Sequence, residues 1–577
     1  MPEQAVALTP FARAAAAIEA WLDGTGAAFA TRTRLPDPRR KVASWDLELQ
    51  HAVHGSQRAS IYLTPDFPAT PPQVRFDRSL CLVLPHIEED GRFCHGIESA
   101  PRDFDEPVEA MVEVLKRLEK FWSDSADPVW IAAEFQRESL SYWLRFCMQY
   151  KPVRGAPRLA DLRVALTELK GPTQGRFAAY FKKDQKARSE LTIASVGEAD
   201  PHGLAVRHGW AVGTLVRGDA LFVPLDADQN WSPQAWPRTL HELEYLVASV
   251  TDNVQSVSKW VEDNKADARY FLVVLVQGKA CYGYLVYPAP VAQLTSPVIV
   301  PVPVERVDPD WTLARDHGLG ALHQRRKKRV LLLGCGSLGA PVAELLARAG
   351  VGELHLLDKE FFGSENCARH LLGASNIGDL KSKDLAIRLR KLVPGIVVKA
   401  HHALATDWIR HQCKPGTYDL VVDCTGESTV RTVLSRLREH SLGDCLVAHA
   451  WMEPFCAASH VVLLQHGNEW PADDPRGKVN VASWPEDTRV QLPACNTGFH
   501  PYGASDVWQA AGFTSERLLA ALDGKVASSV VCSWVRSAGF FQTLGVAVQL
   551  GPLVPPSDSG FDAVQLTRAY KDVFGNE

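Results

Sequence analysis

The chain has 577 residues, which allows roughly three or four domains of about 150 residues each. Hydrophobic residues make up 46%, charged residues 22% and aromatic residues 9%, a balance typical of a folded protein rather than a disordered one. The net charge of -5 is small for this length and favours neither general nucleic-acid binding nor an acidic tail. No segment has the pattern of a signal sequence or approaches the roughly 18 apolar residues of a membrane span, so we expect a cytoplasmic protein.

The first predicted elements form an α+β domain over residues 1–150. A helix over 8–22 begins with Thr9 as its cap and Pro10 at its first position. The segments "KVASWDLELQ" and "RASIYLTP" predict antiparallel strands, and the prolines of "FPATPPQVRF" enforce extended backbone. The stretch "DEPVEAMVEVLKRLEKFW" carries apolar residues at helical spacing and closes the domain.

Residues 151–310 predict a mixed α/β linker domain of unknown role. The strand-like runs "LFVPL", "YFLVVLVQG" and "CYGYLVYPA" surround a predicted helix near 239–263. The segment "SPVIVPVPVERVDPD" is rich in proline and valine, which favours an extended edge or connector. The basic run Arg325 to Arg329 then either binds phosphate or forms a solvated helix end.

From Val330 onward strands and helices alternate, which predicts a Rossmann-like domain over 311–577 with a parallel-rich sheet covered on both faces. The first strand ends in "GCGSLG", with Gly334, Gly336 and Gly339. Such a turn lets the backbone approach phosphates, and Asp358 after the next strand supplies an acceptor for ribose hydroxyls. A nicotinamide enzyme has the same features, so at this point two classes of enzyme remain open.

Further motifs separate these two classes. The segments "AGVGELHLLDKE", "ENCARH", "GDLK" and "DCTG" follow the turn in order, and with it they resemble the ThiF-type adenylating family over roughly 315–545. Ubiquitin-activating enzymes and bacterial sulfur-carrier activators belong to that family. The resemblance implies ATP and Mg²⁺ as cofactors and an α/β multidomain protein whose C-terminal domain adenylates a carboxylate.

The resemblance also implies roles for five polar residues. Joining a carboxylate to the α-phosphate of ATP expels pyrophosphate, so negative charge must meet cations and amides. Arg369 and Lys381 are expected to hold the phosphates, Asn366 to orient them and Asp358 to fix the ribose. Arg315, which precedes the first strand, is the candidate for an arginine that the family supplies from that region.

Asp423 in "DCTG" is the expected magnesium ligand. The family often has a second aspartate in this motif, where the present chain has Gly426, so the metal site rests on Asp423 alone. The alternative is that Asp423 caps a helix at the end of its strand.

The chain has twelve cysteines and no Cys-x-x-Cys pair, which argues against a zinc knot or a disulfide scaffold and favours free thiols. Cys335 and Cys424 lie in the turn or a core strand and are expected to be packing residues. Cys495 in "LPACNTGFHPYGASD" lies in a turn-forming stretch. This stretch resembles the thioester-forming segment of bacterial activating domains, which makes Cys495 a candidate nucleophile; the alternative is an ordinary loop residue.

A second nucleophile is predicted in the first domain. "FPATPPQVRF" followed by "LPHIEEDGRFCHG" resembles the ubiquitin-conjugating fold, and alignment on Ile87 and Gly91 places the nucleophile at Cys94. Where that family has His-Pro-Asn, this chain has Leu-Pro-His, so His86 either replaces the asparagine that steadies the oxyanion, adjusts the attacking amine, or only structures the loop. His95 is a candidate for lowering the thiol pKa through its charge.

These features predict an enzyme that adenylates a protein C-terminus, forms thioesters at Cys495 and then Cys94, and makes an isopeptide bond to a target lysine. Fusions of this kind are similar to those of CBASS-type antiphage islands, which implies that the activated protein is a CD-NTase or a ubiquitin-like protein and that the enzyme is a homodimer. We expect no nucleic-acid or membrane partner.

Three other functions stay open. A sulfur-carrier adenylyltransferase would leave Cys94 incidental, although the absence of Cys-x-x-Cys pairs weighs against the usual bacterial form. A nicotinamide dehydrogenase would leave Asn366, Arg369 and Lys381 unexplained. A scaffold would use its conjugating-like domain only to bind a partner.

Overall fold

The computed structural model describes residues 9–26, 43–67, 69–97, 106–151, 158–183, 185–250, 257–264, 270–288, 297–313, 319–485, 488–490 and 499–575. The chain divides into two compact units, Met1–His202 with Val212–Glu305 and Gly203–Ala211 with Arg306–Glu577. The first two predicted domains, 1–150 and 151–310, thus share unit 1, and the predicted boundary between them stays a prediction.

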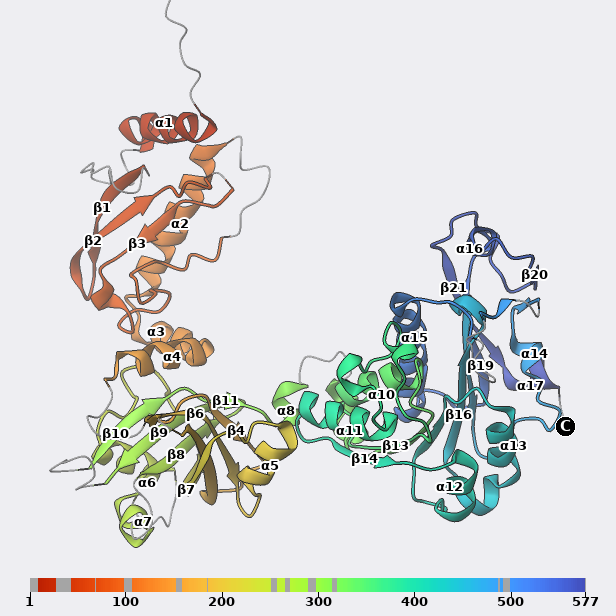
Figure 1. The fold of residues 1–577 in the computed structure, drawn as a ribbon. Helices are drawn as coiled ribbons and strands as arrows, with labels where there is room; N and C mark the ends of the chain where they lie inside the picture. The colour runs from red at the N-terminus through yellow and green to blue at the C-terminus, as the bar shows by residue number, and fades with distance from the viewer. Residues whose placement is uncertain are drawn as a thin grey trace, which may run out of the picture. The chain divides into compact units, whose positions relative to one another are not determined.

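Unit 1 opens with a helix that shares a hydrophobic core with a small antiparallel sheet (Figure 1). Thr9 caps the first helix as predicted, because its hydroxyl accepts the amide of Ala12 at 3.2 Å. The sheet has the order β1-β2-β3. The elements are α1 (Pro10–Asp23), β1 (Ser44–His51), β2 (Gly55–Tyr62), β3 (Gln73–Arg75), η2 (Arg78–Leu80), α2 (Pro107–Asp124), α3 (Pro128–Arg137) and α4 (Ser139–Gln149).

The rest of unit 1 is a mixed eight-stranded sheet with the order β10-β9-β8-β7-β5-β6-β4-β11. Its strands are β4 (Leu162–Ala165), β5 (Thr173–Lys182), β6 (Gln185–Val196), β7 (Thr214–Pro224), β8 (Phe271–Gln277), β9 (Ala280–Tyr287), β10 (Val298–Val302) and β11 (Glu305–Arg306). The valine- and proline-rich segment does supply an edge strand, β10. The predicted helix near 239–263 is wrong as one element, because the structure has two helices there, α6 (Leu240–Ser249) and α7 (Val257–Asn264).

Unit 2 is built on a second eight-stranded sheet with the order β14-β13-β12-β15-β16-β17-β19-β21. The pairs from β14 to β16 are parallel, as predicted, whereas those from β16 to β21 are antiparallel. The strands are β12 (Arg329–Leu333), β13 (Glu353–Leu357), β14 (Val397–His401), β15 (Leu420–Asp423), β16 (Leu446–Met452), β17 (Ala458–Leu464), β19 (Val530–Arg536) and β21 (Ala563–Ala569). A separate two-stranded sheet pairs β18 (Ala482–Ser483) with β20 (Gln549–Leu550).

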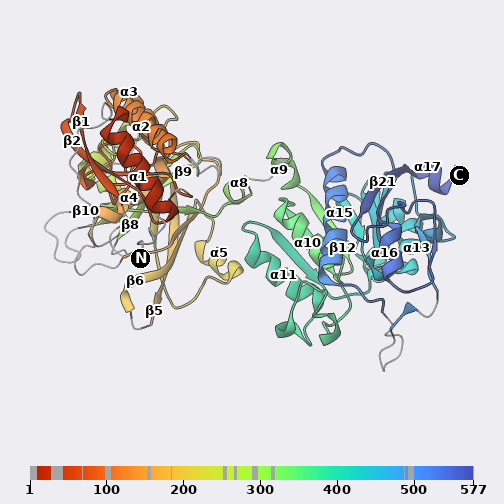
Figure 2. The ribbon, with the colours of Figure 1, turned by 90° about the horizontal axis from the view of Figure 1, so that it is seen from above.

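Helices cover both faces of this sheet (Figures 1 and 2). Val330 and Leu332 of β12 pack into a core with α10, α11 and α15, whereas Leu331 and Leu333 pack into a second core with α12 and α13. Successive side chains of a strand point to opposite faces, which explains why all four are buried. The longer helices are α10 (Gly339–Arg348), α11 (Lys381–Leu392), α12 (Ala405–His411), α13 (Ser428–Arg436) and α15 (Ala504–Leu522).

Short elements connect these layers. They are α5 (Pro201–His208), which is divided between the two units, α8 (Pro309–Thr312), α9 (Leu319–Arg325), η5 (Ser364–Asn366), η6 (Ala374–Asn376), η7 (Arg438–Leu442), η8 (Pro454–Cys456), α14 (Arg476–Val479), α16 (Ala538–Thr543) and α17 (Tyr570–Phe574). Among the helices described in the structure, none combines the length and the apolar character that crossing a bilayer requires.

Candidate active site

The glycine-rich turn lies between β12 and α10, and two of its glycines are required by packing. Gly334 has a φ of +86°, and a Cβ there would lie 3.0 Å from the amide nitrogen of Thr425. A Cβ on Gly339 would lie 1.9 Å from the carbonyl oxygen of Gly334, which is impossible without movement of the backbone. Gly336 differs, because a Cβ there would meet no atom within 4 Å. Its Cα therefore faces space that a ligand can occupy.

The turn presents several free backbone donors. The amide of Cys335 donates to Asp358 Oδ2 at 2.7 Å. The amides of Gly336, Ser337 and Leu338 donate to no group in the described part of the chain. Free amides at the start of α10, together with the helix dipole, favour an anion, so the turn is suited to phosphate oxygens.

Asp358 follows β13 and lies beside the turn. Its Oδ1 accepts the amide of Glu360 at 2.7 Å, and its Oδ2 accepts that of Cys335. Burial raises the pKa of Asp358, and these two hydrogen bonds only partly offset burial. Because each carboxylate oxygen can accept more than one hydrogen bond, Asp358 can orient the turn and still accept a ribose hydroxyl.

Two cavities meet at this turn. The first is lined by Gly334, Gly336, Leu357, Asp358, Lys359, Glu360, Ala403, Leu404, Ala405, Thr406, Cys424, Thr425, Glu427 and Val430. The second continues past Ser337 and Gly426 to a wall with Trp451, Trp484, Phe499, His500 and Tyr502. Gly336, Cys424 and Thr425 line both cavities. A small polar ligand in the first cavity and an extended chain in the second would therefore meet at the glycine turn.

Arg369 is held by aromatic rings. Its guanidinium carbon lies 4.8 Å from the ring centroid of Phe499 and 5.0 Å from that of Tyr502. The hydroxyl of Tyr502 is 2.8 Å from the hydroxyl of Ser337, which ties this aromatic pair to the turn. Rings fix a guanidinium without using its N–H donors, so the donors of Arg369 stay available to phosphate.

Lys381 contacts a residue of the first cavity, whereas Asn366 lines neither cavity. Lys381 begins α11, is 5% exposed, and places its Nζ 2.5 Å from Glu360 Oε2, a residue that lines the first cavity. Asn366 lies in η5 and donates from Nδ2 to the neighbouring Glu365 at 3.1 Å. Both roles, phosphate binding and orientation, stay predictions.

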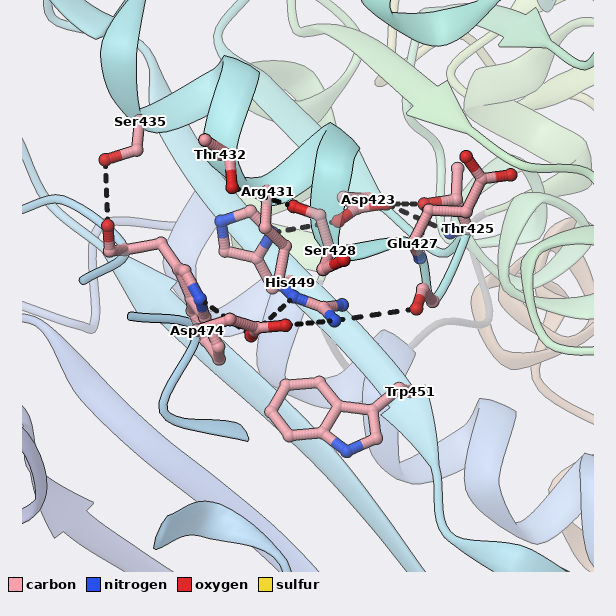
Figure 3. A network of polar contacts seen from close by, with 12 residues as sticks. Asp423, Thr425, Glu427, Ser428, Arg431, Thr432, Ser435, His449, Trp451 and Asp474 are labelled. Atoms are coloured by element: carbon pink, nitrogen blue, oxygen red, sulfur yellow. Dashed lines mark hydrogen bonds and ion pairs between the residues drawn. The ribbon is translucent and has the colours of Figure 1, made fainter. Parts of the chain in front are cut away.

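Asp423 lies at the end of β15 and belongs to a network of polar contacts (Figure 3). Its Oδ1 accepts the amide and the hydroxyl of Thr425, at 3.0 and 2.6 Å, and its Oδ2 is 3.0 Å from His449 Nδ1. Burial raises the pKa of Asp423, but the hydrogen bonds from His449 and Thr425 outweigh it and leave that pKa below its ordinary value. The side chain is 1% exposed, so Asp423 fixes Thr425 at the junction of the two cavities.

This arrangement does not fit Asp423 as a direct magnesium ligand, because the side chain is almost fully buried and its two oxygens already accept three hydrogen bonds from Thr425 and His449. Within the described residues, no cluster of three or more histidine, cysteine, aspartate or glutamate side chains is suited to a metal ion. Gly426, at the place where a second aspartate was expected from the resemblance, has a φ of +70°, and a Cβ there would meet no atom within 4 Å. We therefore assign no step to a metal ion.

The structure describes the two cysteines that were expected to be packing residues. Cys335 is buried, and Cys424 lies between the two cavities; burial raises the pKa of both thiols, which suits packing residues. In the basic run, Arg325 is 6% exposed and makes a bidentate pair with Asp523 at 2.8 Å, so neither alternative describes this residue, and for the rest of the run both stay predictions. Lys328 Nζ donates to Asp419 Oδ1 at 3.2 Å.

Two of the predicted site residues, Arg315 and Cys495, lie outside the described residues.

In unit 1, Cys94 is an exposed thiol on an extended segment. Its amide donates to the carbonyl of His86 at 2.8 Å, and the preceding Phe93 donates to Val74 of β3 at 2.8 Å. Gly91, with a φ of +86°, makes the turn before it, and a Cβ there would lie 2.2 Å from the carbonyl oxygen of Phe76. The two predicted residues Cys94 and His86 thus lie on adjacent backbone segments, with the thiol open to an approaching chain.

His86 is anchored to the helices that follow. It adopts a φ of +59°, uncommon for a residue other than glycine. Its amide donates to the hydroxyl of Tyr142 at 2.7 Å, and its Nε2 lies 3.0 Å from Glu134 Oε2. A carboxylate on one ring nitrogen fixes the orientation of an imidazole, so Glu134 holds His86 in place. Burial lowers the pKa of His95, which disfavours the charge predicted to activate Cys94.

Sequence reasoning missed Glu134, His449 and a third partner, His370. His370 Nε2 lies 2.6 Å from the carbonyl oxygen of Cys335 in the turn. Each of these residues is far in sequence from the group it contacts, and only the position of His370 directly after Arg369 gave any signal.

The turn, the parallel strands around it and the polar residues that follow define a class of domain. Residues 312–451 match the model of the ThiF family, so the chain carries a ThiF-family segment in unit 2. This match confirms the resemblance found in the sequence as far as residue 451; beyond it the resemblance stays a prediction.

The chain is also similar to individual proteins over shorter segments. A 171-residue segment is 33% identical to the ATP-dependent ubiquitin transferase-like protein Cap2 of Vibrio cholerae and covers 28% of this chain and 28% of Cap2. A 108-residue segment is 38% identical to the mouse adenylyltransferase and sulfurtransferase MOCS3, covering 18% of this chain and 23% of MOCS3. Each alignment therefore spans less than a third of the relative's length. A crystal structure of E. coli MccB with MccA-N7isoASN is 15% identical with a TM-score of 0.30, covering 44% of this chain and 69% of MccB, and carries no functional conclusion.

Proposed function

We propose that this protein uses ATP to adenylate the C-terminal carboxylate of a ubiquitin-like or CD-NTase-like protein and transfers the acyl group, through Cys495 and Cys94, to a lysine amine. The single observation that carries the first step is the glycine turn, which has free amides and lines both a polar cavity and a second, aromatic-lined one. The match to the ThiF family and the Cap2 relatives support the same reaction.

In the first step, an oxygen of the substrate carboxylate attacks the α-phosphorus of ATP. A new P–O bond forms, the bond to the β-phosphate oxygen breaks, and pyrophosphate leaves. The turn amides and the guanidinium of Arg369 would face the charge that develops on phosphate oxygens, because such donors act most strongly at buried, preorganised sites. Asp358 would fix the ribose.

In the later steps, the Cys495 thiolate attacks the acyl carbon and AMP leaves, which stores the free energy in a thioester. The Cys94 thiolate then takes the acyl group and releases the Cys495 thiol. A lysine amine finally displaces Cys94 and forms the isopeptide bond. The exposure of Cys94 supports its part as acceptor, because a protein tail must reach the sulfur.

The experiment that tests this proposal follows adducts on non-reducing gels. Wild type, Cys94→Ala and Cys495→Ala are incubated with ATP, magnesium and a purified CD-NTase-family protein, with the same protein lacking its last residues as the control. We expect reductant-sensitive adducts that require an intact substrate C-terminus, with Cys495→Ala unable to load Cys94. A Cys94→Ser variant is the matched control, because an oxyester resists reductant. If Cys495→Ala still loads Cys94, the relay through two thiols is wrong.

A second candidate is a sulfur-carrier or other ubiquitin-like protein adenylyltransferase without conjugation. The match to MOCS3 favours it, since that relative is named an adenylyltransferase and sulfurtransferase. The same gels separate the two functions: adenylation with no adduct at Cys94 would favour this second candidate.

A further inference from the structure

His370 lies between β13 and α11, and its ring contacts the glycine turn. Its Nε2 is 2.6 Å from the carbonyl oxygen of Cys335, and its Nδ1 accepts the amide of Leu372 at 3.0 Å. The ring packs edge-on against Phe362, with centroids 5.0 Å apart. Both ring nitrogens are thus bonded to backbone groups whose donor or acceptor character is invariant.

These two partners dictate the protonation state of the ring. A backbone N–H only donates, so Nδ1 must carry no proton, and a backbone carbonyl only accepts, so Nε2 must carry one. His370 is therefore neutral, with its proton on Nε2. Burial lowers the pKa of His370, and the nearby charge of Lys381 acts in the same direction, which favours the neutral ring.

The hydrogen bond fixes the peptide plane between Cys335 and Gly336. In a trans peptide the carbonyl and the following N–H point to opposite sides of the chain. With the Cys335 carbonyl held by His370 and the Cys335 amide held by Asp358, the Gly336 amide must point away from His370. That amide donates to no group in the described part of the structure, and Gly336 lines both cavities.

We propose that His370 is a positioning residue for nucleotide binding: its Nε2–H holds the Cys335 carbonyl so that the Gly336 amide is presented to an anionic phosphate oxygen. The inference rests on the proposed adenylation function, and it adds a residue that acts through the backbone to those expected to meet the phosphates directly. A rotated peptide would turn the carbonyl oxygen toward the phosphate and replace attraction with repulsion.

The test compares His370→Leu with His370→Gln in the full-length protein. Leucine fills similar space without a donor, whereas the glutamine side-chain amide offers an N–H toward the Cys335 carbonyl. Titration calorimetry measures ATP binding. We expect the Kd of the leucine variant to rise roughly tenfold to a hundredfold, the effect of one hydrogen bond to a charged group, and that of the glutamine variant to stay within a few-fold of wild type.

Two controls keep the outcomes distinct. Phe362→Leu removes the ring contact but neither hydrogen bond, so its ATP affinity should stay near that of wild type. Should the leucine variant fail to fold, His370→Asn, whose shorter amide falls short of the carbonyl, replaces it. Wild-type affinity in the leucine variant, or in the asparagine variant that replaces it, or equal loss in the glutamine and leucine variants, overturns the inference. Failure of wild type to bind ATP overturns the proposed function instead.

Discussion

A substitution at Gly336 can separate an effect on nucleotide binding from an effect on folding stability. A Cβ on Gly336 would meet no protein atom within 4 Å and would project beside the free turn amides, whereas a Cβ on Gly339 would lie 1.9 Å from the carbonyl oxygen of Gly334. We therefore expect Gly336→Ala to fold normally and lose nucleotide binding, and Gly339→Ala to lose stability.

The magnitudes follow from these distances. For Gly336→Ala no packing changes, so stability should stay within about 0.5 kcal/mol of wild type. A phosphate oxygen must approach an amide nitrogen to about 2.9 Å, and a methyl group beside it costs at least one charge-assisted hydrogen bond. A loss of about 3 kcal/mol corresponds to roughly a hundredfold weaker ATP binding. For Gly339→Ala, overpacking costs about 1–3 kcal/mol or more, which lowers Tm by several degrees.

The assay measures Tm by scanning fluorimetry with and without ATP, and the Kd for ATP by calorimetry. Wild type should show a rise in Tm with ATP, because a ligand that binds only the folded state stabilises it. Gly336→Ala should keep the Tm of the nucleotide-free protein and lose that rise. An ATP affinity equal to wild type in Gly336→Ala would refute the assignment of phosphate binding to this turn.

Three other predictions concern the groups around the two sites. Phe499→Leu frees the guanidinium of Arg369 and should weaken ATP binding roughly threefold to tenfold with little change in Tm, measured by calorimetry, since a cation–π contact contributes about 1 kcal/mol. Asp423→Asn should lower stability by about 2 kcal/mol at pH 7. Because the folded-state pKa lies below its ordinary value of 3.8, the stabilising effect of the carboxylate is present above that value and lost as pH falls through the folded-state pKa, so the difference from wild type in urea unfolding should shrink below pH 3.8. Glu134→Gln removes the charge that faces His86 and should slow discharge of a Cys94 thioester to free lysine roughly tenfold, measured by single turnover, while thioester formation stays unchanged; an unchanged discharge rate would leave His86 a loop-structuring residue.

Local patterns predicted much of unit 2, because the signals that define a strand, a glycine turn and a helix start lie within a few residues of one another. Asp358 was found in this way, since the end of a neighbouring parallel strand must lie beside the turn. The antiparallel extension from β16 to β21 was missed, because buried strands read as apolar runs whatever their direction.

The residues that hold the site residues in place could not be predicted from the sequence, for a different reason. His370 contacts a carbonyl 35 residues earlier, and Asp423 bonds His449, 26 residues later. Glu134 meets His86 across 48 residues of chain. No spacing rule connects such pairs, since their contact follows from tertiary packing. The sequence therefore predicted groups that are expected to face a ligand, and not the groups that hold them in place.

Binding of the two proposed substrates would depend on shared residues. Phe499 and Tyr502 line the second cavity, and the same two rings hold the guanidinium of Arg369. Any chain that fills this cavity must contact the groups that orient the arginine expected at the phosphates. Both oxygens of Asp423 accept hydrogen bonds from the protein, and Gly426 has no side chain. Negative charge on the nucleotide would therefore be met mainly by backbone amides and by Arg369 and Lys381. Binding of a substrate tail and alignment of the phosphates would then be coupled, because one pair of rings serves both.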